Sequence, residues 1–447
     1  MKKIVFSFYI LLISSVAFGA NIKSYFNNKE TKSYIDPYRK VRKPGDDLEA
    51  VLIKAADVAK SSLDVAVQDF NLTNYAKALV RAKKRGVKVR VMLEDKYNAS
   101  LAKITAAQKK QLPSKLRSKV KEQQDFLDAN DNGIISKKEI ETRDALTILR
   151  RGKISVKDDF SGPASGVMHH KFVIIDKKFL IVSSANFTRS GIHGDFNSKT
   201  AIGNANSMIV FSNNKLANYF LEKEFIPMWE KGLFKTKKNF KEPVNFSMNS
   251  QNTLVKVQFA PTDIKKYGMN SSTNGLIAKT LARAKRSIKS NLFVFSSQYL
   301  VDQLGKIKRN RPSIKMEFLV DPLFATRYYS QLLDMWGLKM RNKQNCKYDA
   351  NNRPWRLPEN RGGVPDIDSD DKLHHKFSIV DDKVLIYGSQ NWSKSGNEKN
   401  DETLLIIQDA KIVKSFVVEH NRLYKDATKG VTKELINKID SINAHCR

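Results

Sequence analysis

Two copies of one short pattern constrain the fold of this 447-residue chain more than any other feature. Residues 169–176 read His-His-Lys-Phe-Val-Ile-Ile-Asp, and residues 374–381 read His-His-Lys-Phe-Ser-Ile-Val-Asp. A Ser-x-Asn triplet follows each copy at the same distance, at residues 184–186 and 389–391. Apolar runs on both sides of a polar turn predict a β-hairpin at each copy. Because the whole arrangement occurs twice, we expect an internal duplication.

The alternation of side chains along a strand indicates which residues of the pattern share a face. His374 and Lys376 are two residues apart and point the same way, whereas His375 points the other way, into a core. An imidazole beside an ammonium group forms a small anion-binding site that contains a nucleophile. A phosphate diester suits such a site, because its transition state spreads negative charge over oxygens that ammonium groups can hold.

The duplicated pattern closely resembles that of the phospholipase D superfamily, and the resemblance covers most of the chain. It implies an α/β fold of two lobes related by internal duplication, with mixed sheets flanked by helices and one shared active site. It also implies a two-step reaction without a catalytic cofactor. One histidine attacks phosphorus to form a phosphohistidine, while the other protonates the leaving oxygen and then activates water. The matching residues are His169, Lys171, His374 and Lys376 for catalysis, with Ser184, Asn186, Ser389 and Asn391 in support.

Three acidic residues receive supporting roles from their positions. Asp176 and Asp381 lie an odd number of residues after the histidines and face away from them on an ideal strand, so we interpret them as anchors of the hairpin turns. Glu402 is the more plausible carboxylate to orient an imidazole, and Asn206 takes the matching place in the first copy. The two halves are therefore chemically unequal, although the sequence leaves open which histidine attacks.

Hydrophobic periodicity predicts the same order of elements in both halves. Helices are expected over residues 48–60, 73–85, 214–231, 275–289, 300–308 and 410–425. Strands are expected over residues 63–70, 87–94, 291–296 and 314–321. The order strand, helix, strand implies parallel pairing with a right-handed crossover. We expect an N-terminal lobe over residues 20–250, which begins with a polar, extended arm, and a C-terminal lobe over residues 251–447.

An inserted segment of the first copy, about residues 98–143, carries an EF-hand-like pattern. Residues 128–139 fit a calcium loop at every ligand position, with Gly133 at the sharp turn. The expected ligands of a structural calcium ion are Asp128, Asn130, Asn132, the Ile134 carbonyl, Ser136 and Glu139. Helices are expected on both sides, over residues 115–127 and 137–149. The alternative is a surface turn of the kind that Asn, Asp and Gly commonly form.

The N-terminus and the charge of the chain indicate export and a polyanionic partner. Lys2 and Lys3 precede an apolar run and small residues, which predicts a signal peptide over residues 1–19 and a secreted or periplasmic protein. Without this segment the formal net charge changes from +33 to +31. Such an excess attracts nucleic acid or an anionic phospholipid membrane surface. We expect a monomer.

Two features of the second half keep alternatives open. Cys346 and Cys446 either form a disulfide, which we slightly favour in an oxidising compartment, or remain free thiols. The segment 347–371 carries Arg353, Trp355, Arg356 and Arg361. At the mouth of the active site these side chains would suit a nucleic-acid backbone and a stacked base. A basic loop packed on the lobe is an equal alternative.

These observations predict an exported phosphodiesterase, most plausibly a nuclease that acts on DNA or RNA, because phosphate contacts dominate nucleic-acid affinity. The alternative is a phospholipase D that hydrolyses phosphatidylcholine to phosphatidic acid, although no amphipathic interfacial helix is evident. Intact motifs disfavour a binding protein without catalysis. Missing membrane helices disfavour a cardiolipin synthase, and Asp176 and Asp381 disfavour a tyrosyl-DNA phosphodiesterase.

Overall fold

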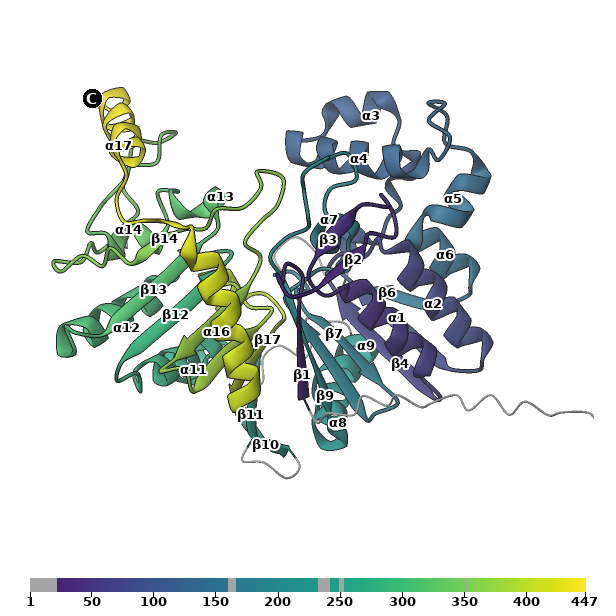
Figure 1. Cartoon of the computed structure of the whole chain (residues 1–447), viewed down its shortest axis with the longest axis horizontal. Coiled ribbons are helices and arrows are strands. Elements are labelled where there is room, and N and C mark those ends of the chain that lie inside the picture. Colours follow the sequence, from purple (N-terminus) through teal and green to yellow (C-terminus); the bar gives the residue numbers. More distant parts are fainter. Residues whose placement is uncertain (1–21, 160–165, 232–241, 249–252, 351) are drawn as a thin grey trace, which may run out of the picture.

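The computed structural model describes residues 22–159, 166–231, 242–248, 253–350 and 352–447, so the expected signal peptide lies outside the described residues. Two α/β lobes lie side by side (Figure 1). The first has a 7-stranded sheet in the order β1 (Ile22–Phe26), β9 (Ser207–Ser212), β8 (Phe179–Ser183), β7 (Lys171–Ile175), β4 (Ser62–Val67), β5 (Lys88–Leu93) and β6 (Ser155–Asp158). The second has a 9-stranded sheet in the order β10 (Val244–Met248), β11 (Thr253–Ala260), β17 (Glu402–Gln408), β16 (Val384–Gly388), β15 (Lys376–Val380), β12 (Ser287–Leu292), β13 (Lys315–Val320), β14 (Gly362–Val364) and β18 (Thr428–Lys429).

The central strands of the two sheets repeat one topology. The order β9-β8-β7-β4-β5 in the first sheet matches β17-β16-β15-β12-β13 in the second. In both, the first strand pairs in parallel with the strand beyond its crossover helix and antiparallel with the motif hairpin. The expected fold class, two α/β lobes built on mixed sheets flanked by helices, is therefore confirmed.

The helices form where apolar periodicity and caps agree. In the first lobe, α1 (Leu48–Val58) begins after Asp47, whose carboxylate accepts a hydrogen bond from Ala50 N at 2.9 Å. α2 (Thr73–Lys84) packs beside α1 over one face of the first sheet (Figure 1). In the second lobe, α11 (Thr273–Leu281) and α12 (Gln298–Asn310) take the corresponding places.

A third apolar core joins the two lobes. It covers the face of each motif hairpin that points away from the first two apolar cores, which pack against α1 and α2 and against α11 and α12. It contains Phe172 of β7 and Phe377 of β15, together with Phe416 of α16 (Ala410–Lys425). β1 of the first lobe also contacts α16, since the Phe26 and Phe416 rings lie 4.9 Å apart. Each fully buried phenylalanine contributes on the order of 2 kcal/mol, so this shared core is a strong attachment between the lobes.

The prediction for the start of the second lobe is wrong by several residues. The helix expected over residues 275–289 ends at Leu281, and β12 begins at Ser287. The strand is hard to recognise because its interior carries polar side chains with buried partners. Ser290 Oγ donates to Ser378 Oγ at 2.8 Å, and Asn291 Oδ1 lies 2.6 Å from His420 Nδ1.

The N-terminal segment is more ordered than the expected extended arm. β1 pairs antiparallel with β9, and β2 (Ser33–Ile35) forms a hairpin with β3 (Arg42–Pro44). Between them, Arg39 Nε donates to buried Asp36 at 2.8 Å, and its guanidinium also donates to the carbonyl of Ala201 at 2.9 Å. Charge-assisted hydrogen bonds hold this segment, and apolar periodicity does not reveal them.

Two expected helices are divided. In the insertion, α4 (Ser114–Leu127) is followed by α5 (Lys137–Arg143) and α6 (Ala145–Arg151), because Asp144 ends α5 and its carboxylate caps α6 through Thr147 N at 2.8 Å. The helix expected over residues 214–231 becomes α8 (Asn214–Phe220), a π-helical turn (Leu221–Phe225) and α9 (Ile226–Lys231). Pro227, which lacks an N–H group, accounts for the change in hydrogen-bond pattern.

The two cysteines form a disulfide, as slightly favoured from the sequence. Cys346 and Cys446 are bonded across a sequence separation of 100 residues. The bond ties α17 (Lys433–His445) to the segment before the second motif. In the chain-entropy account a loop of this size contributes roughly 4–5 kcal/mol.

An aspartate holds the turn of each motif hairpin. Asp381 accepts hydrogen bonds from the backbone N–H groups of Lys285, Arg286 and Ser287 at 2.8, 2.7 and 2.9 Å. Asp176 has the matching contacts, with the N–H groups of residues 60–62. Burial opposes ionisation of Asp381, but the hydrogen bonds outweigh it and lower the pKa of the carboxyl group.

We predict that Asp381→Ala lowers the free energy of unfolding by about 2 kcal/mol at pH 7, because three backbone N–H groups lose a charged acceptor. The contribution is present above the unfolded-state pKa of about 4 and is lost as the pH falls through the lower folded-state value. Denaturant unfolding at pH 7 and at acidic pH measures both effects. Lys383→Ala, in the same turn, is the control, and equal stability of the two variants would contradict the anchor role.

Candidate active site

Backbone bridges across the lobe contact place both motif histidines. His169 N donates to the carbonyl of Asp401 at 3.0 Å, and His374 N donates to the carbonyl of Ala205 at 3.0 Å. Each histidine is thus held by the strand end of the opposite lobe, just before β17 and β9. The internal duplication therefore brings the two copies together at one site.

A carboxylate of the second lobe orients the histidine of the first. His169 Nδ1 lies 2.8 Å from Glu402 Oε2, and the same oxygen accepts a hydrogen bond from Ser389 Oγ at 2.6 Å. Glu402 is fully buried and His169 is 7% exposed. Ser389 therefore holds the orienting carboxylate, and His169 Nε2 remains for chemistry.

An amide takes the equivalent place at the second histidine. His374 Nδ1 lies 3.1 Å from Asn206 Oδ1, which also accepts from Ser184 Oγ at 2.8 Å. The amide orientation is fixed because Asn206 Nδ2 donates to the carbonyl of Gly191 at 3.0 Å. His374 must then donate through Nδ1, so its neutral form carries a free lone pair on Nε2. The inequality expected between the halves is present at this position.

The two motif lysines are buried beside the histidines. Lys171 Nζ donates to the carbonyl of His169 at 2.8 Å, and Lys376 Nζ donates to the carbonyl of His374 at 2.7 Å. Burial lowers the pKa of Lys171 to about 7, and burial together with the charge of Lys171 lowers the pKa of Lys376 far below its ordinary value. Two adjacent buried ammonium groups disfavour each other's charge, and an anion between them would favour both.

The histidines respond to the same field. Burial lowers the pKa of His169 to about 4, although Glu402 acts in the opposite direction. Burial and the two lysines lower the pKa of His374 far below its ordinary value. Without an anion, both imidazoles are therefore neutral at pH 7, and a bound phosphate would raise both pKa values.

The second histidine of each motif, His170 or His375, forms hydrogen bonds on the core-facing side of its strand. His170 Nδ1 lies 2.9 Å from Thr403 Oγ1 of the other lobe, and its Nε2 lies 2.9 Å from Glu224. His375 Nε2 makes the equivalent contact with Glu419 at 2.9 Å. Both histidines face the core as the alternation predicts, but their acidic partners on distant helices are not evident from the sequence.

Each asparagine of the two Ser-x-Asn triplets has one side-chain atom without a hydrogen-bond partner. Oδ1 of Asn186 and Oδ1 of Asn391 are both buried without a hydrogen-bond partner. Asn186 Nδ2 lies 3.5 Å from Gln68 Oε1, one residue beyond the end of β4. Buried polar atoms without partners are rare in folded proteins, and their occurrence at matched positions indicates groups available to a ligand.

Aromatic residues that the sequence did not reveal as site residues lie beside His374. The Phe293 ring lies 4.6 Å from the His374 ring and 4.9 Å from Lys376 Nζ. Phe324 packs against Phe293 at 4.8 Å. Phe293 directly follows β12 as Gln68 directly follows β4, so the site has an aromatic side and a polar side. In the sequence, the position of Phe293 directly after a strand is the signal that could have indicated a site residue.

The basic loop expected at the active-site mouth packs on α12. Arg353 pairs with Asp302 at 2.6 Å, and a Cβ at Gly305 would lie 3.1 Å from Trp355 Nε1. A cavity of about 780 Å³ lies between the loop and the helix, and no motif residue lines it. Its lining includes Lys306, Lys308, Arg309, Arg353, Trp355 and Arg356. The structure thus supports the alternative expectation, a basic loop packed on the lobe.

The EF-hand-like loop presents its oxygen atoms in an ordered turn. Asp128 Oδ2 accepts from Gly133 N at 2.7 Å, and Asn132 Oδ1 accepts from Ile134 N at 2.8 Å. Glu139 accepts from Ala129 N at 2.7 Å, as well as from Ser136 N and Oγ, both at 2.8 Å. Gly133 has a φ of 78°, as the sharp turn requires. These residues, on one loop between α4 and α5, fit the oxygen-rich set that calcium prefers.

The chain belongs to the family of phospholipase D-like domains, because the family model "Cardiolipin synthase, PLD-like domain" matches residues 52–229 and 277–424. Its relatives include proteins named mitochondrial cardiolipin hydrolase. The mouse protein is 30% identical over 161 residues, which are 35% of this chain and 60% of that protein. The dog protein is 32% identical over 160 residues, which are 35% of this chain and 52% of that protein. The chain thus spans about half the length of these curated relatives.

A solved structure supports the fold over nearly the whole chain. Phosphatidylserine synthase from Haemophilus influenzae Rd KW20 is 12% identical and superimposes with a TM-score of 0.55. The match covers 94% of this chain and 96% of that one. At this identity the likeness establishes the arrangement of the two lobes and no more.

Proposed function

We propose that this phospholipase D-like phosphodiesterase is an exported nuclease that cleaves DNA or RNA through a phosphohistidine. The observation that carries the chemistry is the convergence of two histidine–lysine pairs from opposite lobes. Both pairs are buried around the position where an anion would offset the charge of the lysines. All of these residues come from one chain, which is consistent with the expected monomer.

The partners of the histidines suggest a division of labour. When Nε2 of a neutral His169 bonds to phosphorus, the ring becomes positively charged, and the Glu402 carboxylate 2.8 Å away stabilises that charge. His374, protonated once the phosphate offsets the two lysines, donates its proton to the leaving oxygen. It then takes a proton from water as the water attacks phosphorus and the bond to His169 breaks. Lys171 and Lys376 hold the non-bridging oxygens.

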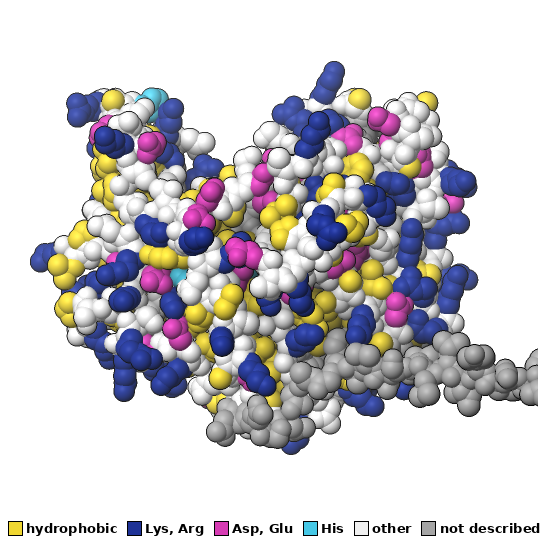
Figure 2. Space-filling model, in the orientation of Figure 1, with side chains coloured by type: hydrophobic (Ala, Val, Ile, Leu, Met, Phe, Trp, Pro, Cys, Tyr) yellow, Lys and Arg dark blue, Asp and Glu magenta, His cyan; other side chains and the backbone are white. Residues whose placement is uncertain are grey.

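Charge and aromatic groups support nucleic acid as the substrate. Lysine and arginine side chains are spread over both lobes on the face that Figure 2 shows. The cavity beside α12 combines cations with the Trp355 indole, and Phe293 lies beside His374. Cationic surfaces with aromatic groups suit a phosphate backbone and stacked bases.

A phospholipid is the second candidate, because the curated relatives are named cardiolipin hydrolases. Leu323, in α13 (Pro322–Ala325), is 49% exposed and adjoins Phe324, so an apolar contact near the site is available. In the described part of the chain, no helix has the length and apolarity needed to cross a membrane.

The substrate is tested with mature protein in EDTA. Plasmid DNA, RNA, phosphatidylcholine vesicles and cardiolipin vesicles are incubated with wild type, His374→Ala and, as a control, His445→Ala. We predict degradation of nucleic acid by wild type and by the control, with a loss of at least about 10³-fold in His374→Ala and no lipid hydrolysis. Histidine-dependent lipid hydrolysis with intact nucleic acid would instead identify the second candidate.

The nucleophile is tested by trapping. The leaving group of bis(p-nitrophenyl) phosphate departs without help from an acid, so His374→Ala should complete the first step and accumulate the covalent adduct. We predict that mass spectrometry after quenching without acid finds the adduct on the His169 peptide. Glu402→Gln should slow adduct formation by about 10²-fold, the value of a charge-assisted hydrogen bond. The assignment would be reversed if His169→Ala carried an adduct on His374 and His374→Ala carried none on His169.

The calcium loop is proposed to stabilise the insertion and to take no part in catalysis. Bound calcium would offset the charges of Asp128 and Glu139 and connect α4 to α5. We predict an affinity in the extracellular range, a Kd on the order of 10⁻⁴ to 10⁻³ M, measured by calorimetry. Calcium should raise the melting temperature of wild type and of Asp131→Asn, but not of Glu139→Gln. An equal rise in Glu139→Gln would exclude this loop as the site.

A further inference from the structure

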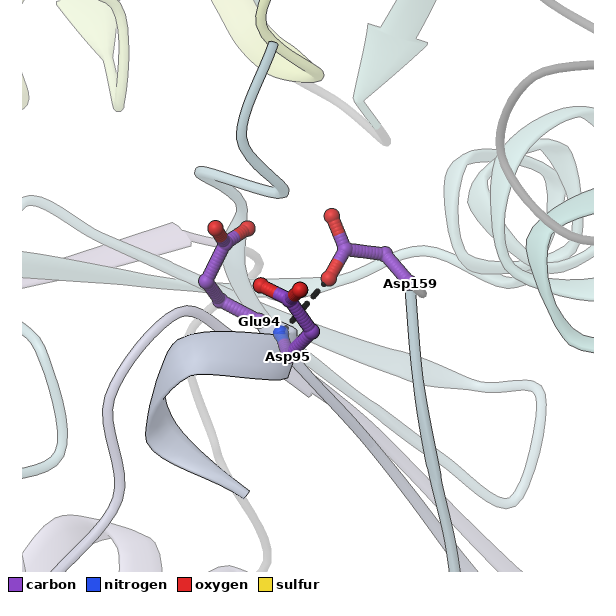
Figure 3. Close-up of side chains that lie close together, drawn as sticks. All are labelled: Glu94, Asp95 and Asp159. Carbon is purple, nitrogen blue, oxygen red and sulfur yellow. Dashed lines mark hydrogen bonds between the residues drawn. The ribbon is translucent and has the colours of Figure 1, made fainter. Parts of the chain in front are cut away.

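A carboxylate beyond the end of β5 holds the backbone that leads into His169. Glu94 Oε2 accepts a hydrogen bond from Met168 N at 2.7 Å. Asp159 accepts from the same N–H at 3.2 Å and from Asp95 N at 2.7 Å (Figure 3). The residue before the motif histidine is therefore fixed by two acidic side chains from the ends of neighbouring strands, β5 and β6.

The second lobe repeats the contact with one carboxylate. Asp321, directly after β13, accepts from Leu373 N at 2.8 Å, and Leu373 precedes His374. Since β13 matches β5 in the sheet order, the two contacts occupy equivalent places in the duplicated fold. Their recurrence over such different sequence separations argues for a shared role.

Each of these carboxylates also acts on the lysine of its own lobe. Burial lowers the pKa of Lys171, and the charges of Glu402, Asp69 and Glu94, in that order, raise it. Burial and the charge of Lys171 lower the pKa of Lys376, and the charges of Glu402 and Asp321 raise it. Ionised Glu94 and Asp321 thus favour the ammonium forms on which phosphate binding depends.

The acidic pair makes the first lobe different from the second. Burial and the adjacent Asp159 carboxyl group raise the pKa of Glu94 to about 8. Among the described residues, Asp95, Tyr97 and Lys171 also interact with Glu94. With the pKa of Glu94 above 7, the pair of carboxyl groups holds a proton at neutral pH.

Within the described part of the chain, no acidic side chain is grouped with Asp321 in this way. Burial alone raises its pKa to about 6, against two backbone hydrogen bonds and the charges of Lys372 and Lys376. Asp321 is therefore ionised at pH 7, whereas the pair in the first lobe still holds a proton. The part of the counter-charge that Glu94 gives Lys171 therefore changes at a higher pH than the part that Asp321 gives Lys376.

We propose that Glu94 and Asp321 are positioning residues of the phosphodiesterase reaction: each fixes the backbone before a motif histidine and adds to the counter-charge that Glu402 gives the neighbouring lysine. Asp159 regulates this counter-charge in the first lobe by sharing a proton with Glu94. The inference rests on the proposed function, because the lysines matter through the phosphate that they bind.

The test compares variants that preserve shape and change charge. Glu94→Gln keeps an oxygen for Met168 N but removes the part of the counter-charge that ionised Glu94 supplies, so the pKa of Lys171 should fall by a fraction of a unit. Asp159→Asn removes the repulsion that keeps Glu94 protonated, so the pKa of Lys171 should rise. Asp321→Asn should lower the pKa of Lys376. Exposed Glu222→Gln is the control, and unchanged melting temperatures would show that the fold is retained.

Two measurements separate this inference from the proposed function. The alkaline limb of kcat/KM for bis(p-nitrophenyl) phosphate in EDTA should move to lower pH in Glu94→Gln and to higher pH in Asp159→Asn. NMR of lysine labelled with ¹³C at Cε, assigned with Lys171→Met, should report the same directions without turnover. Shifts in one common direction, or no shift of Lys171, would overturn the inference. Absence of any diester cleavage, with the Lys171 shifts present, would overturn only the function.

Discussion

The hydrogen bond between His169 and Glu402 joins the two lobes at the candidate active site. Neither lobe alone contains both a motif histidine and the residue that orients it, since His374 likewise depends on Asn206. The site therefore exists only in the docked pair, and the shared apolar core around Phe172 and Phe377 supplies the energy that keeps the lobes docked. Fold stability and site geometry depend on the same contact.

Burial of Lys171 and Lys376 is the main electrostatic cost of this arrangement. Two ammonium groups removed from water disfavour folding unless hydrogen bonds and opposite charges compensate. The carbonyls of the motif histidines, Glu402 and the strand-end carboxylates supply part of that compensation. A bound anion can compensate the rest of the lysine charge. The electrostatic cost that lowers the stability of the free protein would then contribute to affinity for phosphate. A buried cationic site of this kind is built for its ligand.

The sequence predicted the fold where one local pattern determines it, and failed where partners are distant. Two copies of one motif were enough to infer two lobes, and an odd spacing was enough to place Asp381 at a turn. By contrast, the predicted position of β12 was wrong, because Ser290 and Asn291 form hydrogen bonds with partners far away in the chain. Glu94 and Met168 are 74 residues apart, so only the folded chain shows their hydrogen bond. Polar contacts over long separations leave no periodic signal.

Some differences between the two copies lie at the candidate active site, and under the proposed mechanism they give the duplicated site a direction. A displacement at phosphorus places the attacking and leaving atoms on opposite sides. In the proposed order His169 attacks, so the leaving group departs on the side of His374, where Phe293 and Phe324 lie. The group retained in the covalent adduct then remains on the polar side, near Gln68. A symmetric fold thus acquires distinct sides for the two products. The two copies differ at matched positions, with Glu402 in place of Asn206 and phenylalanine in place of glutamine.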